Sequence, residues 1–265
     1  MKKSFILMSI IIFNLQSFAN CFIAKEKNLV IEQEGICSKR YSPASTFKIA
    51  ISLMGYNENI LIDEEHPKLP FKKGYFDRRE KWKQSHTPSL WMKNSCAWYS
   101  QVLTSKIGME KFKEYLAKFH YGNQDVSGDK GKNNGLTRSW LSSSLEISPE
   151  EQTIFLQNLI DDKLLVSPKA HEMTKNIIFV EELLDGWKLY GKTGFCSVLS
   201  EDSMQTLDGR HNEWFVGWIE KDHDTIVFAS YLEHSDKYYN PANKEAKVVA
   251  KEKLQLLINN RKSIK

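Results

Sequence analysis

The chain has 265 residues, 41% of them hydrophobic and 26% charged, so it is long enough to bury a substantial core in one large domain or two smaller ones. Its formal net charge is +4, and the basic residues are dispersed, which gives no case for binding nucleic acid or an anionic membrane. The seven histidines are scattered and form no His-Glu-x-x-His motif, so no metal site is predicted.

Residues 1–19 are typical of a secretory signal peptide. Two lysines open the segment, an apolar run spans Phe5 to Phe13, and Ser17-Phe18-Ala19 is a small-x-small cleavage site. The apolar run is short for a membrane span, and no other stretch approaches about 18 apolar residues. We therefore expect a soluble, exported protein that begins near Asn20. A lipoprotein anchored through Cys21 is the alternative.

Four cysteines follow the predicted cleavage site. Cys21 and Cys37 flank two short β-like runs around a polar turn, and a disulfide that ties the ends of this hairpin is predicted in an oxidising compartment. Cys96 and Cys196 are predicted to be free, buried thiols. The four cysteines lack the paired short spacing that is typical of a zinc site.

The most informative stretch is Ser45-Thr46-Phe47-Lys48. Ser42 is predicted to cap a helix whose first residue is Pro43, so Ser45 lies in the first turn, where unpaired N–H groups and the positive end of the helix dipole can stabilise an oxyanion. Lys48 is three residues on, with its Cβ atom roughly 5–6 Å away on the same face. Apolar residues follow up to Gly55, which is predicted to end the helix. Burial favours the neutral, basic amine, and this indicates acyl transfer through a serine ester.

A short pattern such as Ser-x-x-Lys also occurs by chance. Ser127-Gly128-Asp129-Lys130 fits it too, in a loop rich in Gly, Asp, Lys and Asn with no helix to orient the two side chains. We interpret this second copy as a solvated turn.

The middle of the chain is predominantly helical. Residues 57–90 are predicted to be loops with short helices, and the pattern turns helical from about Ser95. A helix around Trp98 is followed by another that stops before Tyr121. Cap-proline pairs at 148–149 and 167–168 predict two further helix starts.

The last third of the chain changes to β-like patterns. Residues 187–190 are predicted to be a strand that ends at Gly191-Lys192-Thr193-Gly194, and the runs 213–220 and 225–232 a hairpin. A final helix is predicted over about 243–258. Strands at both chain ends with helices between them predict an α/β part, about 20–56 and 180–265, and a helical insertion, about 57–179.

Further side chains suit serine acyl transfer. Ser95, before an apolar helix, could pass a proton to a leaving nitrogen, and Lys192 and Thr193 could hold a carboxylate among glycines. The indole N–H of Trp91 or Trp140 could bond a buried polar group. Each of these residues, taken singly, has an ordinary structural explanation as a cap, a turn or core.

Taken in order, these residues resemble one family, the class D (oxacillinase-type) serine β-lactamases. The resemblance covers nearly the whole mature chain and is carried by Ser45 to Lys48, Ser95-Cys96-Ala97, Tyr121-Gly122-Asn123, Trp140 and Lys192-Thr193-Gly194. It implies an α/β fold with a mostly antiparallel sheet flanked by helices and an inserted all-α domain. It also implies a periplasmic enzyme that hydrolyses penicillin-type β-lactams, confers resistance to them and uses no metal.

The resemblance implies a role for each catalytic residue. Ser45 would be the acylated nucleophile. Lys48, carboxylated by CO₂ or bicarbonate to N6-carboxylysine, would be the general base for acylation and for the deacylating water. Trp140 would hydrogen-bond the carbamate, and Ser95 would relay a proton to the β-lactam nitrogen.

The same resemblance implies the substrate contacts. Lys192 and Thr193 would bind the substrate carboxylate, and the N–H groups of Ser45 and Phe195 would form the oxyanion hole. Gly194 and Trp91 are expected beside the substrate. Two further residues, Tyr121 and Asn123, are expected to be structural supports.

The sequence departs from the family pattern at two places. The second motif ends in Ala97, where valine is usual, and this leaves more room near the carbamate. No arginine between Tyr238 and Lys247 is available to grip the substrate carboxylate, so Lys192 and Thr193 are expected to make that contact alone.

Three other kinds of protein compete with this interpretation. A β-lactam receptor would acylate and stay acylated, but the signal segment and the lack of a membrane span argue against it. A penicillin-binding transpeptidase or carboxypeptidase shares the acyl-serine chemistry, but fits the Tyr-Gly-Asn and Trp140 contexts less well. A secreted binding or structural protein would leave the ordered motifs unexplained.

Overall fold

The computed structural model describes residues 20–199, 206–235, 240 and 244–262. The predicted signal peptide, 1–19, lies outside the described residues, and so does Asn243, at which the last helix is predicted to begin. Within the described part of the chain, no helix combines the length and the apolar composition needed to cross a bilayer.

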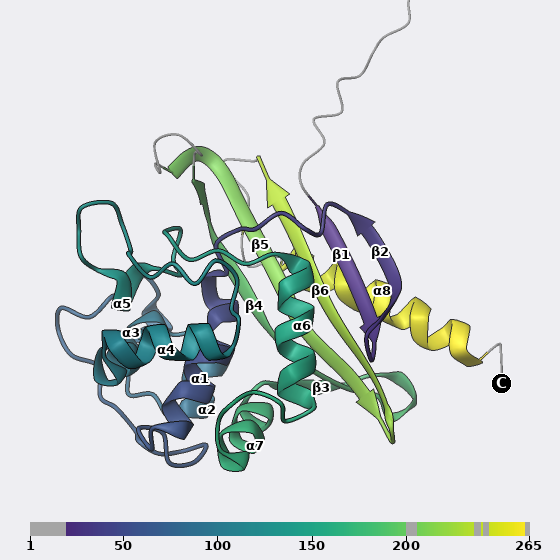
Figure 1. The fold of residues 1–265 in the computed structure, drawn as a ribbon, viewed down its shortest axis with the longest axis horizontal. Coiled ribbons are helices and arrows are strands. Elements are labelled where there is room, and N and C mark those ends of the chain that lie inside the picture. The colour runs from purple at the N-terminus through teal and green to yellow at the C-terminus, as the bar shows by residue number, and fades with distance from the viewer. Residues whose placement is uncertain (1–19, 200–205, 236–239, 241–243, 263–265) are drawn as a thin grey trace, which may run out of the picture.

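Six antiparallel strands form one sheet in the order β2-β1-β6-β5-β4-β3. The N-terminal hairpin lies beside β6, so the two ends of the chain meet in the sheet (Figure 1). This confirms the predicted antiparallel sheet built from both chain ends. The strands are β1 (Cys21–Glu26), β2 (Leu29–Gly35), β3 (Phe179–Glu182), β4 (Lys188–Leu199), β5 (Thr206–Lys221) and β6 (Asp224–His234).

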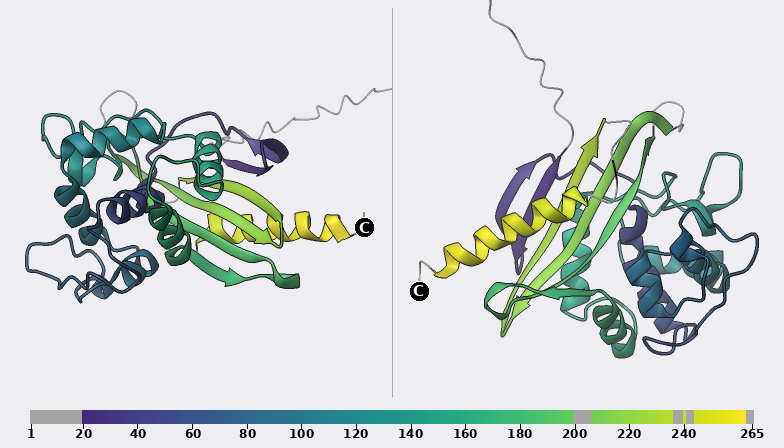
Figure 2. Two further views of the ribbon diagram at one scale, coloured as in Figure 1. Left: turned by 60° about the horizontal axis from the view of Figure 1, so that its bottom comes forward. Right: turned by 180° about the vertical axis from the view of Figure 1, so that it is seen from behind.

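Helices cover both faces of the sheet. The C-terminal helix α8 lies along one face, and α6 and the other helices lie on the opposite side (Figure 2). The helical elements are η1 (Ala44–Phe47), α1 (Lys48–Asn57), η2 (Glu80–Trp82), α2 (Pro88–Asn94), α3 (Ala97–Ile107), α4 (Met109–Lys118), α5 (Gly135–Arg138), α6 (Pro149–Ile160), α7 (Pro168–Ile177), η3 (Leu184–Gly186) and α8 (Glu245–Lys262). The division into an α/β part and a helical insertion at 57–179 stays a prediction.

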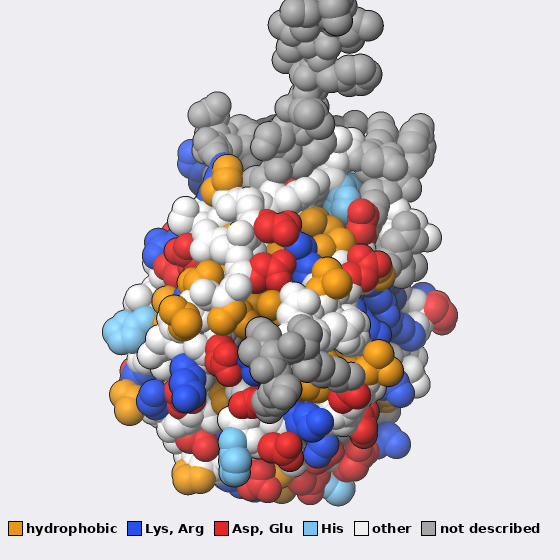
Figure 3. All heavy atoms as spheres, turned by 90° about the vertical axis from the view of Figure 1, so that its right-hand side faces the viewer, with side chains coloured by type: hydrophobic (Ala, Val, Ile, Leu, Met, Phe, Trp, Pro, Cys, Tyr) orange, Lys and Arg blue, Asp and Glu red, His pale blue; other side chains and the backbone are white. Residues whose placement is uncertain are grey.

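The alternation of side chains along β5 separates two hydrophobic cores. Trp214 and Val216 belong to the large core shared with the helices of the α6 side, whereas Phe215 and Ile219 pack in the smaller core under α8. This is the period-2 pattern of a strand buried on both faces. On the surface shown in Figure 3, acidic and basic side chains are intermixed rather than gathered by sign.

Several local predictions are confirmed. The Ser148 hydroxyl accepts the N–H of Glu151 at 3.1 Å, and the Glu151 carboxylate accepts the N–H of Ser148, which completes a capping box at the start of α6. Ser167 caps α7 in the predicted way. The turn before Asp224 joins β5 to β6 as the predicted hairpin.

Three other predictions are wrong, each because a distant segment decides the geometry. Ser42 caps no helix, since its hydroxyl donates to the Trp140 carbonyl at 3.0 Å. Gly55 does not end α1 but lies buried within it, where a Cβ atom would meet the Leu61 side chain at 2.9 Å. Lys192 to Gly194 do not end a strand, because β4 continues to Leu199 in register with β5. The short strand β3 was not predicted.

The disulfide prediction is confirmed. Cys21 and Cys37 are bonded, with Cα atoms 5.2 Å apart, and Cys96 and Cys196 are free and buried. The bond joins the start of β1 to the residues after β2 and so closes the hairpin at its open end.

Replacing both Cys21 and Cys37 with alanine is expected to lower the free energy of unfolding by about 3 kcal/mol, because the bond closes a loop across a sequence separation of 16 in the unfolded chain. Urea unfolding of the variant and the oxidised parent measures the difference. Adding reductant should lower the midpoint of the parent and leave that of the variant unchanged. An equal midpoint for the two oxidised proteins would contradict the prediction.

Candidate active site

Ser45 occupies the start of a helical segment that lies against the sheet. In η1 its three neighbours Ala44, Thr46 and Phe47 are buried, whereas Ser45 is partly exposed. Ala44 has a φ of 50°, a left-handed conformation that costs a residue with a Cβ atom about 1–2 kcal/mol. Strain of this kind is common at functional sites. In this turn, Ser45 is therefore accessible to a ligand, whereas the residues on either side of it are buried.

Lys48 lies directly behind Ser45. Its side chain is 0% exposed, and Nζ donates to Ser45 Oγ at 3.2 Å. Burial lowers the pKa of Lys48 to about 7; the nearby Cys96 thiol acts in the opposite sense, and the positive charge of Arg79 lowers this pKa further. The burial predicted from the apolar helix is confirmed. Near neutral pH a large fraction of this amine is therefore unprotonated, and the neutral amine can accept a proton.

Trp140 is a fully buried side chain with an unpaired donor. Its rings lie 5.5 Å from the Phe47 ring and 6.3 Å from the Phe112 ring, centroid to centroid. Among the described residues, the indole N–H has no hydrogen-bond partner. A buried donor without an acceptor is costly. The site thus holds a free N–H in the same aromatic cluster as Phe47, the residue before Lys48.

Ser95 and Lys192 form the second polar pair of the site. Lys192 Nζ donates to Ser95 Oγ at 3.0 Å and to the Thr193 carbonyl at 3.1 Å. Ser95 ends α2 with a φ of 54° instead of capping α3, whose N-cap is Cys96. Burial holds the pKa of Lys192 well below its usual value, and the positive charges of other lysines and of an arginine add to this effect.

The free edge of β4 delimits the site. The short strand β3 pairs with β4 only as far as Tyr190, and no other described strand pairs with that edge beyond it. Gly194 lets this edge approach η1, since a Cβ atom there would lie 2.9 Å from the Pro43 carbonyl oxygen. Lys192 and Thr193 are neighbours in a strand and so project from opposite faces. A ligand held by both would lie at the strand edge.

Tyr121 and Asn123 lie behind the site. The Tyr121 ring packs 5.1 Å from the Phe47 ring, and the Gln152 amide donates to its hydroxyl at 3.5 Å and to Thr46 Oγ1 at 2.9 Å. The Asn123 amide donates to the Ser144 carbonyl at 2.8 Å and accepts the Glu146 N–H. The contacts of Tyr121 and of Asn123 thus stabilise the loops around η1.

Not all of the remaining predicted residues lie next to Ser45 and Lys48. Trp91 is fully buried, its N–H donates to Ser100 Oγ at 2.9 Å, and its ring stacks on Tyr99, which favours a packing role. Phe195 is partly exposed beside the site, with its ring 5.3 Å from that of His211. Ala97 is buried.

Two positioning residues were missed by sequence reasoning. The Trp214 indole N–H on β5 donates to the Ser42 carbonyl at 3.0 Å, and the Ser142 hydroxyl donates to the Ser197 carbonyl on β4 at 2.8 Å. These bonds connect segments that lie 172 and 55 residues apart in the sequence. No local pattern marks either residue.

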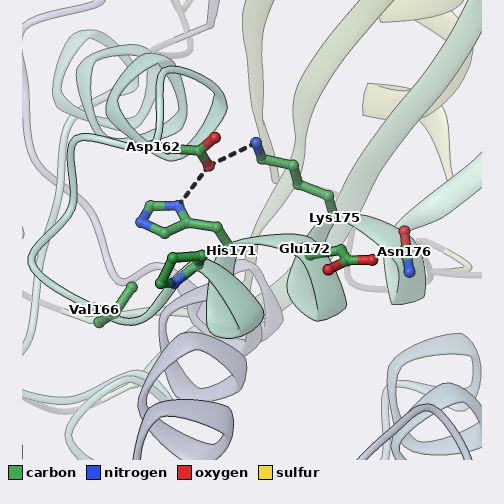
Figure 4. Close-up of a pocket in the computed structure, with 7 residues that line it drawn as sticks. Asp162, Val166, His171, Glu172, Lys175 and Asn176 are labelled. Atoms are coloured by element: carbon green, nitrogen blue, oxygen red, sulfur yellow. Dashed lines mark hydrogen bonds and ion pairs between the residues drawn. The ribbon is translucent and has the colours of Figure 1, made fainter.

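A separate surface pocket of about 450 Å³ lies on α7, away from this group. Within it the Asp162 carboxylate accepts from Lys175 at 2.8 Å and lies 3.2 Å from His171 Nδ1 (Figure 4). None of the predicted site residues lines it, so we assign it no part in the reaction. In the described residues, no group of three or more His, Cys, Asp or Glu side chains is arranged to hold a metal ion.

Comparison with known proteins gives one family match and several relatives that agree with each other. The model of the family described as "Penicillin binding protein transpeptidase domain" matches residues 19–255. β-Lactamase OXA-9 of Klebsiella pneumoniae is 40% identical over 231 residues, which is 86% of this chain and 84% of the relative. β-Lactamase OXA-1 of Escherichia coli is 45% identical over 201 residues, which is 74% of this chain and 68% of the relative.

Among solved structures, the class D β-lactamase OXA-427 superposes with a TM-score of 0.84 at 38% identity. The superposition covers 92% of this chain and 98% of the other. The likeness therefore extends over most of the length of both chains.

Proposed function

The chain belongs to the class D serine β-lactamases, and from this premise we propose that it hydrolyses penicillin-type β-lactams in the periplasm through an acyl-enzyme on Ser45, thereby conferring resistance. One observation carries the proposal. A fully buried lysine amine, with a pKa lowered to about 7, lies 3.2 Å from the partly exposed Ser45 hydroxyl. A serine becomes nucleophilic when a neutral base is poised to take its proton.

Acylation begins with Ser45 and Lys48. As Ser45 Oγ bonds to the β-lactam carbonyl carbon, the neutral Lys48 amine accepts the hydroxyl proton. The N–H groups of Ser45 and Phe195 stabilise the oxyanion that forms on the carbonyl oxygen. When the carbon–nitrogen bond of the ring breaks, Ser95 gives its proton to the leaving nitrogen and regains one from Lys192, 3.0 Å away. The negative carboxylate of the bound substrate favours the protonated form of Lys192, against the effect of burial.

The residues around Lys48 fit a carbamate formed from CO₂ or bicarbonate. Carboxylation requires a neutral amine, which burial provides, and the product requires a donor, which the unpaired Trp140 N–H provides. When formed, the carbamate would take the place of the free amine and supply a carboxylate as the general base for acylation and for the deacylating water. Trp140 would hold it, and the apolar rings of Phe47 and Phe112 beside Trp140 limit access of bulk water.

Substrate binding is assigned to the free edge of β4. Lys192 and Thr193 bind the ring carboxylate there, and Gly194 allows the substrate-bearing edge to stay close to Ser45. Tyr121 and Asn123 support the loops behind η1. Trp91 serves the packing of α2 and α3.

The test follows hydrolysis of a penicillin and of a chromogenic cephalosporin by the purified mature protein, with and without bicarbonate. Turnover that rises with bicarbonate supports a lactamase with a carboxylated Lys48. A stoichiometric burst that then stops, whether or not bicarbonate is present, indicates a receptor or a penicillin-binding protein. No reaction with either substrate refutes the acyl-enzyme proposal.

Replacing Trp140 with phenylalanine is expected to slow deacylation by about 100-fold, because the carbamate loses its buried donor. Acyl-enzyme then accumulates and is detected as a mass increment on the intact protein after brief mixing with penicillin. Trp218→Phe is the control, since the Trp218 N–H already bonds the Glu220 carboxylate away from the site. Normal turnover by the Trp140 variant, without a mass increment, means that Trp140 is merely core.

A further inference from the structure

Three basic side chains lie near enough to Lys192 for their charges to act on it and have no assigned role. Arg79, Lys81 and Lys244 are exposed, and the positive charge of each lowers the pKa of the buried Lys192 amine. We call these three residues the cationic rim. None of them forms an ion pair with a carboxylate of the described residues.

Two members of the rim belong to the η2 segment, which is bonded to the residue before Ser95. The Trp82 indole N–H donates to the carbonyl of Asn94, the residue before Ser95, at 3.0 Å. The Arg79 guanidinium lies 5.5 Å from the centre of the Trp82 ring, and Lys81 directly precedes Trp82. The segment that carries Arg79 and Lys81 is thus fixed to the chain next to Ser95, whose hydroxyl bonds Lys192.

Lys244 approaches from the other face of the sheet. Its carbonyl accepts the N–H of Lys247 at 2.9 Å in the first turn of α8. The Lys247 amine lies 5.7 Å above the Phe215 ring, and Phe215 is the cross-strand partner of Thr193. Lys244 therefore stands on the Thr193 side of β4, at the positive end of a helix, where a further positive charge is unfavourable.

Among the described residues, the rim differs from the basic residues next to it in forming no ion pair with a carboxylate. Lys83, two residues after Lys81, pairs with Glu80 at 3.0 Å, and Lys247 pairs with Glu181 at 3.1 Å. Loss of hydration lowers the pKa of Lys81, and the charges of Arg79 and Lys244 lower it further. Like charges that gather without counter-charges destabilise the free protein, and a bound anion would remove that repulsion.

Resting on the proposed function, we propose that the cationic rim binds a second negative group, carried on the acyl side chain of the substrate, and so selects doubly negative penicillins. Lys192 and Thr193 already account for the ring carboxylate. The rim cations are exposed and come from two segments, η2 and the start of α8, so they are available to a substrate side chain that extends from the β4 edge toward solvent.

The test uses two substrates that differ by one carboxylate, benzylpenicillin and α-carboxybenzylpenicillin. The measured quantity is the ratio of kcat/KM for the dicarboxylate to kcat/KM for the monocarboxylate, at low ionic strength. In Lys81→Gln and Lys244→Gln this ratio is expected to fall about three- to tenfold from the parent value, mainly through KM for the dicarboxylate. Salt at about 0.5 M should lower the parent ratio in the same direction.

Lys83→Gln and Lys247→Gln are matched controls, because each removes one nearby positive charge that a carboxylate already neutralises. Their ratios should stay within about twofold of the parent value. A ratio that is unchanged in both rim variants, or that falls equally in the controls, overturns the proposal.

If either substrate acylates the protein without turnover, the second-order rate of acylation, followed by intact mass, replaces kcat/KM in the same ratio. Acylation with an unchanged ratio refutes the rim alone. No acylation by either penicillin refutes the proposed function and, with it, this inference.

Discussion

Replacing Ser45 with alanine is expected to abolish both acylation and turnover of penicillin, with a loss of about 10⁴-fold or more in kcat. The Ser45 hydroxyl is a partly exposed polar group at the start of the helical segment. Among the described residues, it is the hydroxyl that is hydrogen-bonded to the Lys48 amine. Intact mass after incubation with penicillin should show no increment, and the hydrolysis assay should show only the background rate.

The matched control is Ser127→Ala, which removes the serine of the other Ser-x-x-Lys pattern. Ser127 is exposed in an irregular loop, as predicted for a solvated turn, and its N–H bonds the Asp125 carboxylate. This variant should acylate and hydrolyse normally. Hydrolysis retained by the Ser45 variant, at any substantial fraction of the parent rate, would sink the nucleophile assignment.

Replacing Lys48 with methionine is expected to have two opposite effects. Deacylation should be lost, and acylation slowed, because the base is gone. The free energy of unfolding in CO₂-free buffer at pH 7 should nevertheless rise by several kcal/mol, because an apolar side chain of similar length replaces a fully buried amine.

The stability gain of the methionine variant is expected to depend on pH. The pKa of Lys48 is about 7 in the folded protein and 10.5 in the unfolded chain, so between these values the unfolded chain binds more protons. The parent therefore gains stability from this group as pH rises from 7 to 10.5. The advantage of the methionine variant should be largest at or below pH 7 and shrink toward pH 10.5.

Urea unfolding of the parent and the variant at several pH values measures this difference. Lys175→Met is the control, since Lys175 pairs with Asp162 at the edge of the α7 pocket and is only partly buried. Full turnover by the Lys48 variant would refute the base role. A pH-independent stability difference would show that Lys48 is not a buried amine with a lowered pKa.

Local features of this protein could be predicted because their causes lie within a few residues. The start of α6 follows from Ser148, a proline and Glu151, which satisfy each other's backbone groups. The N-terminal hairpin and its disulfide follow from two β-like runs between Cys21 and Cys37. The Lys48 amine is buried because the helix that carries it is apolar on every side.

Where predictions failed, a contact from a distant segment outweighed a local preference. The Ser42 hydroxyl bonds Trp140, 98 residues away, instead of capping a helix. Gly55 and Gly194 look like helix and strand terminators in the sequence, yet both lie inside elements. A Cβ atom at either position would come too close to the Leu61 side chain or the Pro43 carbonyl, so close packing and not a turn accounts for these glycines. The Trp91 N–H, by contrast, bonds a buried polar group as predicted, the Ser100 hydroxyl.

The sequence by itself determined which chemistry-bearing residues the chain contains, their order, and the local elements that carry them, because hydrophobic period, caps and turn residues act over a few positions. Only the tertiary structure decided which of them meet. Lys192 bonds Ser95 across 97 residues, and it feels the positive charges of Arg79 and Lys81, from the η2 segment, and of Lys244, from the start of α8. Packing of η1 against β4 and β5, and of η2 against the segment that carries Ser95, brings these residues into one region, and no short-range pattern encodes that.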